Sequence, residues 1–76
     1  MKELLEITIK GLVDNKQTVS IEEKIANDII TYQVNVDKND MGQVIGKQGK
    51  MAKSIRTVMK SVASKERKKI NVEFVG

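Results

Sequence analysis

The chain has 76 residues and a net charge of +4, and it contains neither cysteine nor histidine. A chain of this length forms one domain, and it lacks disulfides, thiolate metal sites, and the commonest metal ligand and general base. The sequence therefore predicts a single domain over residues 1–76 that binds a partner, with no enzymatic activity, metal, cofactor or small-molecule substrate.

No run of residues approaches the roughly 20 apolar residues of a membrane-spanning helix. The first six residues carry charges where a secretory peptide requires an unbroken apolar stretch. We therefore expect a soluble, cytoplasmic protein that does not contact membranes.

The first predicted element is an amphipathic helix that ends near Asp14-Asn15. Its apolar residues recur at i, i+4, i+7 and i+8, which is the spacing of one helix face. These residues are Leu5, Ile9, Leu12 and Val13.

Two strands joined as a β-hairpin are predicted next. Apolar and polar residues alternate over residues 30–36, and more weakly over residues 19–25, where Glu23 breaks the series. Residues 26–28, Ala-Asn-Asp, lie between the strands and suit a tight turn.

The middle of the chain predicts two helices separated by a glycine-containing loop. Asn39-Asp40 is expected to cap a short helix, residues 41–45, which ends at Gly46 in a left-handed turn. After Gly49, a longer segment carries apolar residues on one arc and basic or hydroxyl residues on the other. The apolar arc is expected to lie in the core and consists of Met51, Ala52, Ile55, Val58, Met59, Val62 and Ala63.

A third strand is predicted over residues 70–74, which completes the order α-β-β-α-α-β. Helices packed on one face of a three-stranded sheet form a two-layer α+β domain. The other face of the sheet is expected to be polar, with side chains from Glu22, Lys24, Thr31, Gln33, Asn35, Asn71 and Glu73.

The charge is concentrated in one part of the chain. Residues 42–69 hold nine basic residues and one acidic residue, whereas the remainder holds five basic and nine acidic residues. This division favours a polyanionic partner, although a solvated basic helix face would give the same pattern.

Gly46 and Gly49 flank Lys47 and Gln48. Glycine allows a ligand to approach the backbone without a Cβ, and N–H groups at the start of the next helix favour an anion such as phosphate. The spacing alone is weak evidence, since about one chain in three of this length contains it by chance. Its position between two predicted helices, at the start of the basic segment, favours binding of a nucleic-acid backbone. A P-loop is excluded because one residue too few separates Gly42 from Gly46 and because glutamine stands where serine or threonine would bind magnesium.

The run from Asp40 to Lys50, followed by Ile55-Arg56, resembles the K-homology (KH) motif, and the element order is similar to the type II, bacterial form of this domain. The size of the chain resembles the small stand-alone KH proteins of bacteria, the KhpA-like family. The resemblance covers essentially the whole chain and is weakest in the hairpin, which lacks the expected glycine turn. It implies a single-stranded RNA-binding protein of low sequence specificity that acts in post-transcriptional regulation or as an RNA chaperone, with a link to bacterial cell shape.

The resemblance also implies a binding site. In KH domains, the G-x-x-G loop clamps the backbone of about four nucleotides, and the bases lie in an adjacent shallow groove. Here the loop and the following lysines would hold the backbone, and apolar residues together with the second strand would form the floor of the groove. The RNA-binding residues implied in this way are Val44, Ile45, Gly46, Lys47, Gln48, Gly49, Lys50, Lys53, Ile55 and Arg56.

Several alternatives stay open at the level of sequence. Val44 and Ile45 fit core positions equally well, Lys53, Arg56 and Lys60 fit a role in solubility alone, and the residues do not separate RNA from single-stranded DNA. The resemblance implies a homodimer, a heterodimer with a larger KH-containing (Jag- or KhpB-like) protein, or both. The rival function is a dimerisation or adaptor module that uses exposed apolar residues such as Met59 or Val62. Beyond these residues lies a basic cluster of undetermined role, Lys65, Arg67, Lys68 and Lys69.

Overall fold

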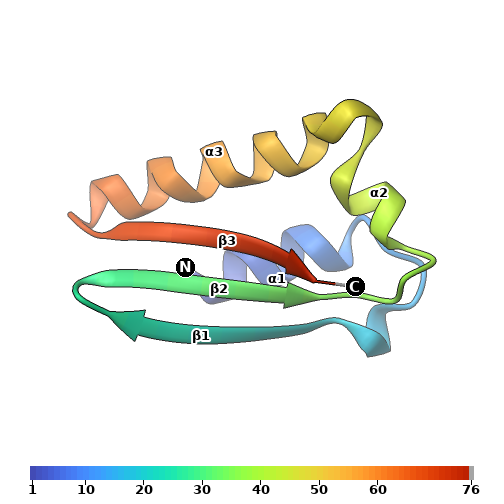
Figure 1. The fold of residues 1–76 in the computed structure, drawn as a ribbon, viewed down its shortest axis with the longest axis horizontal. Helices are drawn as coiled ribbons and strands as arrows, with labels where there is room; N and C mark the ends of the chain where they lie inside the picture. Colours follow the sequence, from blue (N-terminus) through green and yellow to red (C-terminus); the bar gives the residue numbers. More distant parts are fainter. Residues whose placement is uncertain (76) are drawn as a thin grey trace.

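All helices lie on one face of a three-stranded sheet (Figure 1). The structure is a computed structural model that describes residues 1–75. Its element order confirms the two-layer α+β, KH-like arrangement expected from the sequence. The elements are α1 (Lys2–Lys10), a 3-10 turn η1 (Lys16–Thr18), β1 (Ser20–Ala26), β2 (Ile29–Asn35), α2 (Met41–Ile45), a 3-10 turn η2 (Lys47–Gly49), α3 (Lys50–Lys65) and β3 (Lys69–Val75).

The sheet has the order β1-β2-β3 and is mixed. β1 and β2 form an antiparallel hairpin, whereas β2 and β3 are parallel because α2 and α3 connect them by a crossover. The register pairs Glu22 with Gln33, and Gln33 with Glu73, so these side chains share one face. The expectation of a polar outer face is thereby confirmed.

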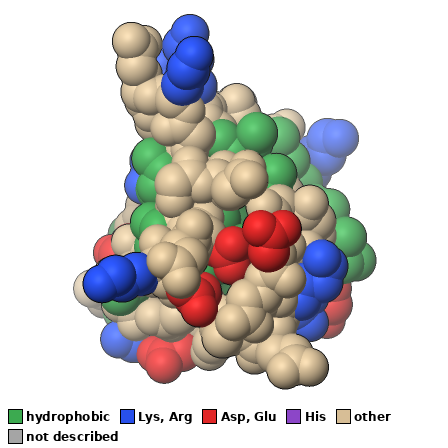
Figure 2. Space-filling view, turned by 90° about the vertical axis from the view of Figure 1, so that its right-hand side faces the viewer, with side chains coloured by type: hydrophobic (Ala, Val, Ile, Leu, Met, Phe, Trp, Pro, Cys, Tyr) green, Lys and Arg blue, Asp and Glu red, His purple; other side chains and the backbone are tan. Residues whose placement is uncertain are grey.

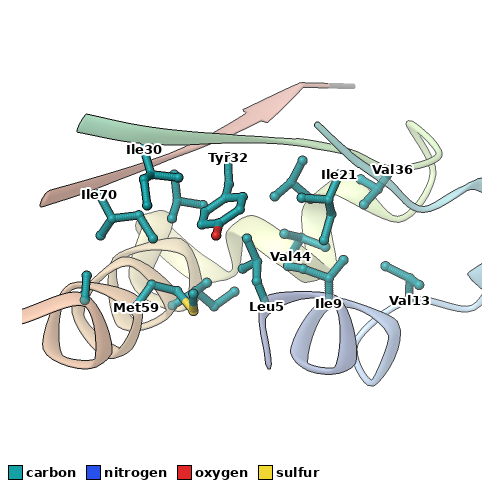
Figure 3. Close-up of a cluster of buried hydrophobic side chains, with 14 residues drawn as sticks. Leu5, Ile9, Val13, Ile21, Ile30, Tyr32, Val36, Val44, Met59 and Ile70 are labelled. Carbon is teal, nitrogen blue, oxygen red and sulfur yellow. The ribbon is translucent and has the colours of Figure 1, made fainter. Parts of the chain in front are cut away.

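The core lies between this sheet and the helices (Figure 3). Leu5 and Ile9 of α1, Val44 of α2 and Met59 of α3 lie in one buried cluster with Tyr32 of the central strand. Burial, together with the neighbouring Glu23 carboxylate, raises the pKa of Tyr32 to about 12. Within residues 1–75, no helix has the length and apolar character required to cross a bilayer.

The end of the first helix was wrongly predicted. α1 ends at Lys10, where the N–H of Gly11 still bonds to the carbonyl of Ile7, and the chain then leaves the helix. Val13 reaches the core from the following turn, so it keeps the expected burial without the expected helix.

The side chain of Asp40 fixes the position of the turn that follows α1. Asp40 begins α2 but makes no side-chain cap there, in contrast to the expectation. Its buried carboxylate instead accepts bonds from the backbone N–H groups of Asp14, at 3.2 Å, and Asn15, at 3.1 Å. The carboxylate therefore ties the loop after α1 to the start of α2.

Two other expectations are corrected at the surface. The apolar arc of α3 is narrower than predicted, because Met51 is 37% exposed and Val58 is 53% exposed. The rival adaptor reading named Met59 as an exposed residue, but Met59 is buried and Val62 is half-buried.

Candidate nucleic-acid interface

The loop between α2 and α3 has an unusual backbone. Gly46, Gln48 and Gly49 have φ values of 76°, 56° and 74°, a region that glycine adopts freely and that most residues with a Cβ avoid. The Gly46 N–H bonds back to the Gly42 carbonyl at 2.9 Å, and the Gly49 N–H bonds to the Gly46 carbonyl at 3.2 Å. The chain thus reverses within four residues and starts α3 at Lys50.

The loop projects from the body of the molecule. Figure 2 views the end of the molecule that carries α2, and it shows a protrusion at the top with Lys or Arg side chains at its tip. Acidic side chains gather lower on the same face. Both side chains inside the loop, Lys47 and Gln48, are exposed, as are Lys50 and Lys53 in the first turn of α3.

The two glycines face different surroundings. A Cβ on Gly46 would lie 2.6 Å from the Met51 Cβ and 2.9 Å from the Met51 nitrogen, whereas a Cβ on Gly49 would meet no atom within 4 Å. The missing side chain of Gly46 therefore makes room for the first turn of α3. Open space for a ligand is present at Gly49, and not on the Cβ side of both glycines as expected.

The backbone at the start of α3 is available to an anion. Gly49 occupies the N-cap position, and no side chain caps the helix there. The Lys50 N–H already bonds to the Lys47 carbonyl, whereas the following N–H groups of the first turn have no partner within the helix. The positive end of the helix dipole lies at the same point. A phosphate next to Gly49 would meet both features together with Lys47 and Lys50.

The expected apolar floor is mostly buried. Val44 is 0% exposed and Ile55 is 4% exposed, so both belong mainly to the core, although Ile55 also lines a shallow surface pocket between α1 and α3. Ile45 is half-buried and keeps an accessible part. The contribution of the second strand to the groove stays a prediction; in the sheet, β2 is central and β3 is the edge strand next to α3.

Arg56 joins α3 to this edge. Its Nε donates to the Val72 carbonyl at 3.1 Å, and its guanidinium carbon lies 5.2 Å from the centre of the Phe74 ring. These contacts fix Arg56 across the gap between α3 and β3, although the residue as a whole stays exposed. From the sequence, Arg56 was included in the site, but no role was assigned to Phe74. The alternation of Phe74 with Val72 predicted a strand, and this pattern was the one signal that could have placed Phe74 near the basic helix.

Few carboxylates balance the basic segment. Among residues 1–75, ion pairs within 4 Å join only Lys10 to Glu6 and the N-terminal amine to Glu3. None of the nine basic side chains in residues 42–69 is therefore paired with an acid of the described chain. Unpaired cations along one helix produce a positive potential that attracts polyanions.

Comparisons with known proteins cover almost the whole chain. A family model described as "KhpA/KhpB, KH domain" matches residues 2–74. The chain is 49% identical over 75 residues to "RNA-binding protein KhpA" of Clostridium perfringens, covering 99% of this chain and 100% of the relative. It is 45% identical to the protein of the same name from Listeria monocytogenes, covering 99% of both chains. The protein of that name from Chlamydia trachomatis is 40% identical, with 99% of this chain and 96% of the relative covered.

Proposed function

Since the chain belongs to the KhpA/KhpB KH-domain family, we propose that it is a non-enzymatic, cytoplasmic protein that binds single-stranded RNA by clamping the sugar–phosphate backbone at the loop of residues 46–49. The names of its relatives support RNA as the ligand. The observation that carries the clamp is the projecting loop, in which Gly49 is open to solvent and the neighbouring lysines have no acidic partner among residues 1–75.

Binding of low sequence specificity fits these residues. Phosphate contacts position a strand and supply most of the affinity, but they carry no information about the bases. Tyr32 is buried and Phe74 lies against Arg56, so the described chain offers no free aromatic platform for base stacking. Contacts to base edges along β3 would then give only a weak preference. We infer a role in post-transcriptional regulation or as an RNA chaperone, in keeping with such binding.

The test replaces Lys47 and Gln48 together by aspartate. Two negative charges would face the phosphates, and Asp tolerates the left-handed backbone of Gln48, whose φ is 56°. Affinity for a single-stranded RNA, measured by fluorescence anisotropy at low salt, should fall by at least tenfold. The circular dichroism spectrum and the melting temperature should stay close to those of the unmodified protein.

The chain provides a matched control for this variant. Lys16 and Gln17 form the same dipeptide, are both exposed, and also lie in a 3-10 turn, η1. Aspartates at these two positions impose the same change of net charge away from the loop. Equal loss of affinity in both variants would mean that only net charge matters, and full affinity in the Lys47/Gln48 variant would refute the clamp.

A second candidate function is a dimerisation or adaptor module, and a specific surface favours it. Leu4 and Ile7 of α1, together with Met51 and Val58 of α3, expose large apolar side chains. A shallow pocket of about 220 Å³ lies between these helices and is lined by Thr8, Met51 and Val58, among others. The partner would be a second copy of the chain or a larger KH-containing (KhpB-like) protein. Partner capture that survives the Lys47/Gln48 change, together with normal cellular function, would favour this role over RNA binding.

A further inference from the structure

A second group of unpaired cations lies at the end of α3 remote from the loop. There the helix, the turn after it and the start of β3 enclose an open pocket of about 360 Å³. We call it the distal basic pocket, and it is lined by Ile29, Lys60, Lys68, Lys69, Ile70 and Asn71. It contains three ammonium groups, one amide and no carboxylate.

Two acids lie near this pocket, and neither neutralises it. Glu66 is in the turn after α3, and Asp28 lines an adjoining pocket together with Arg67 and Lys68. Neither carboxylate forms an ion pair within 4 Å with any described basic side chain. The local balance therefore remains positive.

The turn after α3 has an arginine, Arg67, at a position whose backbone conformation favours glycine. The Lys68 N–H bonds to the Ala63 carbonyl at 2.9 Å and the Arg67 N–H to the Ser64 carbonyl at 3.0 Å, which together form a Schellman motif. Its left-handed residue is Arg67, with φ 58°. Glycine adopts this backbone without strain. Local folding therefore does not require an arginine here. Arg67 lines the adjoining pocket together with Lys68, so its charge adds to the cations at this end of the molecule.

The helix dipole explains only part of the cluster. Basic residues in the last turn of a helix interact favourably with its negative end, and Lys65 occupies that position. Lys60 lies more than a turn earlier, and Lys69 belongs to β3. The effect of the dipole fades beyond the last turn, so it does not explain these two lysines.

A basic track connects the loop with this pocket. Lys53, Arg56 and Lys60 are spaced three and four residues apart, which places them on one side of α3. Arg56 identifies that side as the one next to β3, because it bonds to the Val72 carbonyl. From Lys50 to Lys60 the helix rises about 15 Å, a span within reach of an extended oligonucleotide.

We propose that the distal basic pocket binds a further phosphodiester of the same RNA strand, after the strand has passed along the track from the loop. The proposal rests on the proposed function and extends it. It makes the binding site longer than the roughly four nucleotides that a G-x-x-G clamp holds.

The experiment compares an RNA of the length held by the clamp with an RNA of twice that length, over a series of salt concentrations. The slope of log affinity against log salt increases by about 0.7 for each phosphate contact on a single strand. For the unmodified protein, the longer RNA should give a slope steeper by about 0.7–1.4 than the shorter RNA. A gain due only to more binding positions on the longer strand would raise the affinity without changing the slope.

Two variants locate this additional contact. Replacing Lys60, Lys68 and Lys69 by glutamine should remove the extra slope for the longer RNA and leave the shorter RNA unaffected. Replacing Lys2, Lys16 and Lys24 by glutamine removes the same charge elsewhere and should preserve the difference. Arg67→Gly should reduce the slope for the longer RNA without lowering the melting temperature, because glycine suits the backbone there.

The outcomes separate this proposal from the clamp. Equal slopes for the two RNAs, or an unchanged slope in the glutamine variant of the distal basic pocket, would overturn the second contact even if the shorter RNA binds. If the shorter RNA does not bind, or binds equally well to the Lys47/Gln48 aspartate variant, the proposed function itself fails.

Discussion

Gly46 and Gly49 belong to one motif but carry different constraints. Gly46 has φ 76° and ψ 177°, a region that only glycine populates, and its Cβ side is filled by the start of α3. Gly49 has φ 74° and ψ 12°, which is the left-handed region, and it faces open space. One glycine therefore serves the fold, and the other leaves the surface accessible.

Alanine at each position should separate these roles. Gly46→Ala combines backbone strain with a close contact against Met51 and should lower the free energy of unfolding by about 2–5 kcal/mol. Gly49→Ala adds only the strain of a left-handed residue, about 1–2 kcal/mol. Chemical denaturation of the two variants measures this difference.

Gly49→Asn is the control for backbone strain, since asparagine tolerates the left-handed region. It should be more stable than Gly49→Ala and still bind RNA less tightly than the unmodified chain, because its side chain occupies the open space. Equal destabilisation by alanine at residues 46 and 49 would contradict the assignment of separate roles.

At the scale of single residues, the sequence predicted which residues form the loop but not which atoms surround them. The glycine spacing and the lysines are visible in the chain, whereas the filled side of Gly46 depends on how α3 starts. The burial of Val44 and Ile55 likewise depends on packing against α1 and the sheet. The environment of a side chain is set by residues distant in sequence, and a local pattern does not encode it.

The sequence predicted the types of the helices and strands more accurately than the residues at which they end. The alternation in β2 and β3 and the helical period in α3 match the structure because each pattern extends over several residues. α1 is the exception, since Leu12 and Val13 continue the helical spacing although the helix ends at Lys10. The Asp40 carboxylate holds the following turn across 25 residues of sequence, and this contact left no local signal.

The hairpin turn offers an element-scale prediction. Asn27 and Asp28 have φ values of 51° and 66°, as in a type I′ turn, for which Asn-Gly is the preferred pair. Asp28→Gly should therefore raise the free energy of unfolding by about 0.5–1 kcal/mol, since relief of strain exceeds the added chain entropy. Thermal denaturation provides the measurement.

Ala26→Gly is the control for this substitution, because residue 26 lies at the end of β1 with no positive φ. The same added flexibility there should destabilise the protein by about 0.5–1 kcal/mol. If both glycines lower the stability, strain at Asp28 does not limit the hairpin.

The molecule has three surfaces of different chemistry. The open face of the sheet is polar, the side of α3 next to β3 is basic, and the outer side of α1 and α3 carries exposed apolar residues. RNA and a protein partner could therefore occupy separate surfaces of one molecule. A second copy bound through the apolar side would supply a second loop, and two linked sites bind a long RNA more tightly than one.

The apolar side is tested by replacing Ile7 and Val58 with serine. These residues are 71% and 53% exposed, so the change should barely affect the fold, and removing them should shift any dimer toward monomer in sedimentation experiments. Affinity for a long RNA should then fall because avidity is lost, while affinity for an RNA of clamp length should not change, since the loop at residues 46–49 is intact. Ile25→Ser is the control, because Ile25 is 68% exposed at the end of β1 and is not among the residues that line the pocket between α1 and α3. The double variant could instead keep both the sedimentation mass and the long-RNA affinity of the unmodified protein. In that case the exposed apolar side plays no part in self-association, and any avidity for long RNA comes from another surface.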